Sequence, residues 1–68
     1  MYNADRLQLL IRQVTQQRER FIQTGYALHR IFFTDGYMLL GRITQDVSQS
    51  PEIRDKALEA MHRLALRG

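Results

Sequence analysis

Few side chains in this sequence have the types and spacing that catalysis or metal binding requires. Glu59 and His62 form a Glu-x-x-His pair, a spacing used in helical di-iron sites, but such a site needs further carboxylates from other helices. Ser48 and Ser50 stand just before a proline and fit a helix break and a helix cap better than nucleophiles. Cysteine is absent, which excludes disulfides and thiolate ligands. We therefore predict no catalytic residue, no metal ligand and no cofactor, and expect the protein not to be an enzyme.

The composition indicates a small folded protein that is helped by a partner. The chain has 68 residues, of which 44% are hydrophobic, and a net charge of +3. A single domain of this size buries so little surface that the isolated monomer would be only marginally stable, so we expect oligomerisation. No apolar run approaches the roughly 20 residues that cross a bilayer, and the first residues lack a secretion signal. We expect no membrane association and a soluble protein in the cytoplasm.

The first half of the chain has the apolar spacing of one long amphipathic helix over residues 3–33. Asn3 or Asp5 can cap its start. Gly25 could end this helix or let another helix approach closely. We interpret it as an interior residue, because the apolar positions after it keep the phase of those before it. Arg18 lies within the apolar seam and either lays its stem over apolar surface or sets the register of a paired helix. The residues predicted to form the core or dimer contact are Leu7, Ile11, Val14, Phe21, Leu28 and Phe32.

The second half predicts a return arm made of two shorter helices. Residues 34–36 (Thr-Asp-Gly) are interpreted as the turn, followed by a helix over 37–47. The sequence Ser-Pro-Glu at 50–52 is typical of a helix start, so a third helix is predicted over 51–67. The alternative is a β-hairpin, with strands at 26–33 and 37–44 around the same turn. Its apolar residues do not alternate cleanly, which favours helices.

The predicted fold is therefore all-α, an antiparallel helical hairpin in which one long helix faces a broken second arm. The whole chain, 1–68, forms one small domain. A single hairpin has two layers and leaves much of the apolar face of each arm exposed to solvent. Two hairpins would close a four-helix-like bundle, so we predict a homodimer.

A cluster of aromatic residues and methionine around the predicted turn is the most distinctive functional feature. Such residues are enriched at protein interfaces, although the cluster could also be the end of a dimer core. The predicted partner-binding residues are Phe33, Tyr37, Met38, Arg30 and Arg42. They favour a non-enzymatic protein that binds and modulates a host or regulatory protein, for example an inhibitor or anti-activator of a bacterial regulator, an adaptor or a secretion chaperone.

The alternative function is a small nucleic-acid-binding transcriptional regulator. Arg12, Arg20 and Arg30 could contact phosphates along one helix. Five acidic residues, at 19, 46, 52, 55 and 59, interrupt any basic face, which makes this alternative weaker than the binding of a protein.

Overall fold

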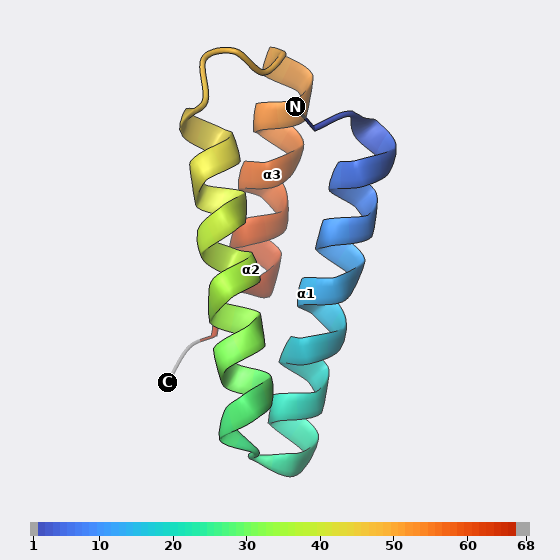
Figure 1. Ribbon diagram of the computed structural model, residues 1–68, viewed down its shortest axis with the longest axis vertical. Coiled ribbons are helices and arrows are strands. Elements are labelled where there is room, and N and C mark those ends of the chain that lie inside the picture. The colour runs from blue at the N-terminus through green and yellow to red at the C-terminus, as the bar shows by residue number, and fades with distance from the viewer. Residues whose placement is uncertain (1, 67–68) are drawn as a thin grey trace.

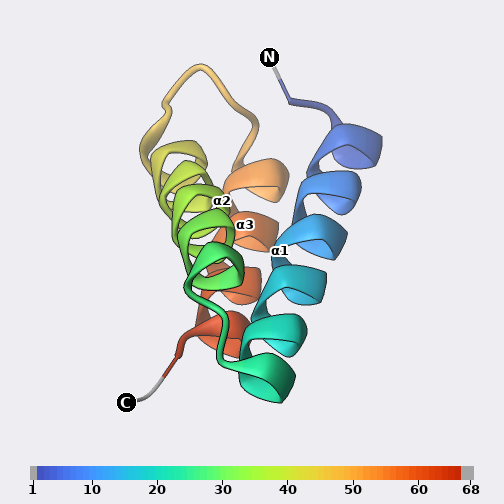
Figure 2. The same ribbon diagram turned by 60° about the horizontal axis from the view of Figure 1, so that its bottom comes forward.

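The computed structural model describes residues 2–66 and contains three α-helices (Figure 1). They are α1 (Ala4–Thr24), α2 (Ala27–Gln45) and α3 (Pro51–Leu64). Neighbouring helices in the chain run antiparallel, with α1 and α2 side by side and α3 packed behind both (Figures 1 and 2). The all-α prediction is confirmed, since residues 2–66 include no strand. The β-hairpin alternative is wrong.

The predicted single helix over residues 3–33 is wrong, because the chain reverses at Gly25. This residue has φ +70° and closes α1 by donating its backbone N–H to the Phe21 carbonyl oxygen at 2.7 Å. Glycine adopts this left-handed conformation without the steric cost that a Cβ imposes. Leu28 and Phe32 therefore belong to a second, antiparallel helix. Their match to the phase of α1 is a coincidence.

Replacing Gly25 by alanine should lower the free energy of unfolding by about 1–2 kcal/mol, the cost of holding a Cβ-bearing residue in the left-handed region. A Cβ at this position would meet no atom within 4 Å, so the effect reports the backbone alone. Urea denaturation measures it, with Gln23→Ala on the exposed side of α1 as the control. Equal or greater stability of Gly25→Ala would contradict the role of this residue as the point of reversal.

The predicted turn at 34–36 is also wrong, since these residues lie in the middle of α2. Gly36 faces α1, and a Cβ built on it would overlap Cγ2 of Val14. The glycine serves close helix packing here, so the two helices approach at a point where any side chain would hold them apart. The predicted helix over 37–47 is replaced by the second half of α2, which ends at Gln45.

The start of α3 is as predicted. The Ser50 hydroxyl accepts a hydrogen bond from the Ile53 N–H at 3.3 Å, and Pro51 and Glu52 occupy the first turn. The helix ends at Leu64, before the predicted end at residue 67, which lies outside the described residues. With 14 residues against 21 in α1 and 19 in α2, α3 stops well short of the turn that joins α1 to α2 (Figure 1).

The core lies along the line where the three helices meet. Two leucines, Leu7 and Leu40, are the largest fully buried side chains. In α3 the fully buried positions include Ala57 and Ala60, whose small side chains let this helix approach the other two. The remaining buried hydrophobic residues are Ile11, Val14, Phe33, Ile43, Ile53 and Leu64. The predicted two-layer hairpin is therefore a three-helix bundle with its own closed core.

Polar contacts hold the connection between α2 and α3. The Asp46 carboxylate accepts hydrogen bonds from the Ser48 hydroxyl and backbone N–H at 2.6 and 2.9 Å, which keeps the pKa of this carboxyl below its usual value. The buried Gln49 side chain reaches the N-terminal segment. In the amide orientation that pairs donors with acceptors, it donates to the Tyr2 carbonyl oxygen at 3.0 Å and accepts from the Tyr2 N–H at 3.1 Å.

Candidate functional site

One side of α2 presents large apolar side chains to solvent. Leu28, Ile31, Phe32 and Met38 are each more than half exposed. Their spacing of three, four and seven residues places them on one face of the helix. We call this surface the outer α2 stripe; it also contains Asp35, the half-buried Leu39 and Arg42. Exposed apolar surfaces of this kind are typical of contact sites.

The stripe exists because α2 is apolar on two sides. Phe33, Leu40 and Ile43 point into the bundle and are buried, while the stripe residues lie on the side of the helix away from them. The side of α2 that packs on α3 includes Tyr37, whose hydroxyl donates to the Met61 carbonyl oxygen at 3.2 Å. No helix of residues 2–66 covers the stripe (Figure 1).

Two hollows lie along the stripe, and the larger one connects it to α1. The larger has a volume of about 400 Å³ and is lined by Tyr2, Arg6, Leu9, Leu10, Gln13 and Leu39. The second, of about 300 Å³, is lined by Asp35, Met38, Leu39 and Arg42. Because Leu39 lines both, the apolar surface continues from the middle of α2 to the first turns of α1. Leu9 adds to it, since it is itself about half exposed.

The end of the bundle beyond α3 has only two layers. The Arg18 guanidinium marks the boundary, because its Nε donates to the Leu64 carbonyl oxygen at 3.1 Å and so satisfies an acceptor at the end of α3. This contact ties α1 to α3, a role that neither interpretation of Arg18 included; both interpretations stay predictions. The sequence contains no signal for it, because the partner is a backbone atom 46 residues away.

Two further contacts close the seam between α1 and α2 in this two-layer part. The Gln17 amide oxygen lies 2.9 Å from His29 Nδ1. The Arg30 guanidinium lies over the Phe21 ring, 6.0 Å from its centroid, within the range of a cation–π interaction. Ile22 and Tyr26 remain exposed at the tip.

The structure rearranges the predicted partner-binding residues. Phe33 is 5% exposed and belongs to the core rather than to a binding surface. Tyr37 is half-buried and stacks on Phe33, with 5.5 Å between the ring centroids. Arg30 is exposed but lies over an aromatic ring of its own chain. Met38 and Arg42 are exposed, and both belong to the outer α2 stripe.

The residues predicted for the core or dimer contact also separate into groups. Leu7, Ile11 and Val14 are buried in the bundle, and Phe21 is partly buried. Leu28 and Phe32 are more than half exposed and lie outside the core cluster, so their prediction as a contact with a second molecule stays a prediction. Sequence reasoning missed Ile31 as a surface residue, although its spacing from Leu28 and Met38 is helical.

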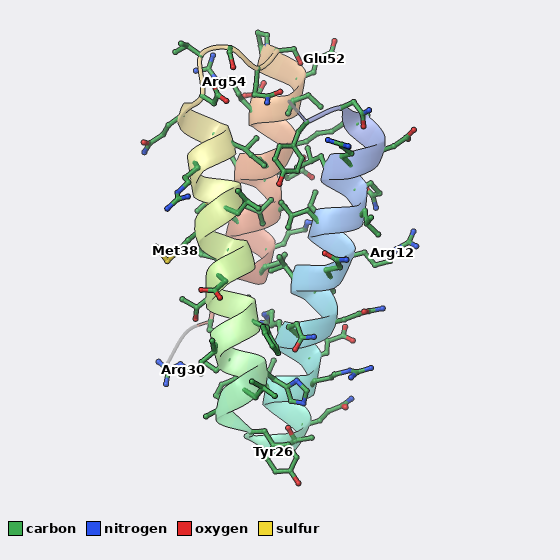
Figure 3. The ribbon with its side chains drawn as sticks, viewed as in Figure 1. Arg12, Tyr26, Arg30, Met38, Glu52 and Arg54 are labelled. Atoms are coloured by element: carbon green, nitrogen blue, oxygen red, sulfur yellow. The ribbon has the colours of Figure 1, made fainter. Side chains whose placement is uncertain are left out.

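The remaining candidate groups do not assemble into a site. Glu59 and His62 are both exposed on α3, and residues 2–66 contain no cluster of three metal-ligating side chains. Arg12 and Arg30 project from different helices toward opposite sides of the bundle (Figure 3). They do not form the single basic line that the nucleic-acid alternative assumed.

Among the described residues, no helix combines the length and the apolar character that crossing a bilayer requires. Comparison of the chain with known protein families, with curated proteins and with solved structures found no significant match.

Proposed function

We propose that this chain is a non-enzymatic protein that works inside the cell by binding and modulating another protein, and that the outer α2 stripe is the binding surface. Inhibition of a regulator, a role as adaptor and secretion chaperoning are the activities of this class. The proposal includes self-association into a homodimer. The observation that carries it is the exposure of Leu28, Ile31, Phe32 and Met38 on a bundle whose core is already closed.

The energetic argument rests on the free energy that is gained when these apolar side chains leave water. Burying a large aliphatic or aromatic side chain stabilises a complex by about 1.5–3 kcal/mol, and a few such anchors dominate most interfaces. Phe32 and Met38 are of the types enriched there. The charged rim that normally surrounds such anchors is also present, because Asp35 and Arg42 line the same hollow as Met38.

Affinity capture with matched variants tests the proposal. The bait is the full chain carrying Phe32→Ala and Met38→Ala, compared with wild type and with Leu58→Ala. Leu58 is the control because it is also an exposed leucine, 45% accessible, but on α3. We expect wild type and the Leu58→Ala chain to retain the same partner, and the affinity of the purified partner for the double variant to fall at least tenfold.

Circular dichroism of each bait must show the same helix content, since all three substituted residues are exposed. Retention of the partner by the double variant at unchanged affinity would rule out the stripe as the binding surface.

A further inference from the structure

We infer that a second copy of this chain covers the outer α2 stripe, with the two α2 helices antiparallel and Asp35 of each copy facing Arg42 of the other. The inference rests on the proposed function, because the second copy occupies the same surface when the other protein is not bound, and the inference fixes the register of that pair. It is carried by the position of the charges on the stripe, by the hollow beside it and by the size of the face.

The charges define the register. Asp35 and Arg42 are the charged residues of the stripe, they have opposite signs, and they lie seven residues apart, which is two turns or roughly 10.5 Å along the helix. A two-fold contact must be self-complementary. A two-fold axis between Met38 and Leu39 places each aspartate opposite the partner's arginine and brings the four apolar side chains of these two positions together at the centre.

Three other arrangements of the same two helices set like charges against each other. A parallel pair in register places aspartate beside aspartate and arginine beside arginine. An antiparallel pair centred on Asp35 or on Arg42 brings two identical charges into contact. Like charges at an interface suppress wrong pairings, so the sequence of the stripe selects the antiparallel pair centred between Met38 and Leu39.

In this register the larger hollow lies at the level of Phe32 of the other copy. Phe32 is six to seven residues before the proposed axis, so on the partner it reaches the level of Gln45 at the end of α2. Because α1 and α2 run antiparallel (Figure 1), this end of α2 lies beside the first turns of α1, where Tyr2, Arg6 and Leu9 line the hollow of about 400 Å³. A cavity of about 150 Å³ already admits benzene. Each copy thus offers an exposed aromatic ring and an apolar hollow to receive one.

The size of the face agrees with a stable pair. The Cα trace extends over 36 × 21 × 15 Å, and the broad 36 × 21 Å face is the one formed by α1 and α2 (Figure 1). A stable interface takes about 800 Å² from each partner, which is close to the area of this face. Contact along the edge of a single helix would be too small, so the contact extends from α2 onto the residues of α1 that line the larger hollow, which do not include Arg12.

Charge reversal with exchange tests the register. The variants are Asp35→Arg, Arg42→Asp and the double variant, all studied as the full chain by sedimentation equilibrium. Each single reversal removes two ion pairs and creates two like-charge contacts, because the two-fold axis doubles every change. We expect either single variant to raise the dissociation constant of the dimer by about tenfold or more. The double variant should return to the wild-type value, and so should an equimolar mixture of the two single variants.

The matched controls are Asp55→Arg, Arg12→Asp and their mixture, which change the net charge equally at exposed positions of α3 and α1. They should leave the dissociation constant unchanged. A dimer that the stripe reversals do not weaken, or that the double variant does not restore, would overturn the register while leaving the stripe as a binding surface. A chain that stays monomeric up to about 1 mM, a concentration at which even weak pairs with dissociation constants near this value form, would overturn the inference. The capture experiment with Phe32→Ala and Met38→Ala would still decide the proposed function, because its readout is a different protein.

Discussion

Phe33→Ala should destabilise the protein by about 3–5 kcal/mol, the usual cost of removing a buried aromatic side chain. The ring is 5% exposed, packs in the core and stacks on Tyr37. A domain of this length has a total stability of only a few kcal/mol to about 10 kcal/mol, so a large part of the population is expected to unfold at 37 °C. Thermal denaturation followed by circular dichroism measures the loss.

The neighbouring phenylalanine is the matched control. Phe32 is 51% exposed, so Phe32→Ala should change the free energy of unfolding by less than about 1 kcal/mol under conditions in which the chain is monomeric. The same substitution should instead weaken association. If the two variants were equally unstable as monomers, the assignment of Phe33 to the core and of Phe32 to the surface would be incorrect.

Gly36→Ala should lower the free energy of unfolding by about 1–3 kcal/mol, although alanine is the better helix former. The added Cβ would overlap Cγ2 of Val14, and a β-branched side chain on a helix has little rotamer freedom with which to move away. The two helices would therefore have to separate, or Val14 would have to leave its preferred rotamer. Chemical denaturation of the purified variant gives the change in free energy.

Two comparisons isolate this contact. Gly41→Ala is the same substitution in the same helix, where a Cβ would lie at an ordinary 3.4 Å from the flexible end of Met61, so it should stabilise by about 0.5–1 kcal/mol. In a Val14→Ala background the obstacle to Gly36→Ala is gone, and the second substitution should then stabilise. Gly36→Ala and Gly41→Ala variants of equal stability would show that close packing at Gly36 is unimportant.

Local signals in the sequence predicted the helical class and the residues that cap the starts of α1 and α3. The Asn3 side chain accepts from the Arg6 N–H at 2.8 Å, and Ser50 caps α3 as expected. These features depend on side chains within three residues of the backbone groups they satisfy. The apolar spacing of Leu7, Ile11 and Val14 is also a local signal, and it correctly predicted that these residues lie on the buried face of α1.

The break between α1 and α2 was not predictable in this way, because glycine has two different uses in this chain. Gly25 adopts a left-handed conformation and reverses the chain, whereas Gly36 lies inside a helix and permits close contact with α1. The close contact at Gly36 depends on Val14, which is far away in sequence, and the residue type alone does not show which of the two roles a glycine has. The aromatic cluster failed as a guide for a similar reason, since Phe32 and Phe33 are adjacent and only the direction of α2 decides which of them is buried.

The unequal lengths of the helices give the molecule a thick end and a thin end. Near the turn that joins α1 to α2 only two helices pack against each other, so we expect the thin end to open first in local unfolding, with the least protected amide hydrogens. An occupant of the outer α2 stripe contacts this same region through Leu28 and Phe32. Its binding energy adds to the stability of the native state by mass action. For the proposed pair of copies, we therefore expect the melting temperature to rise with the concentration of the protein.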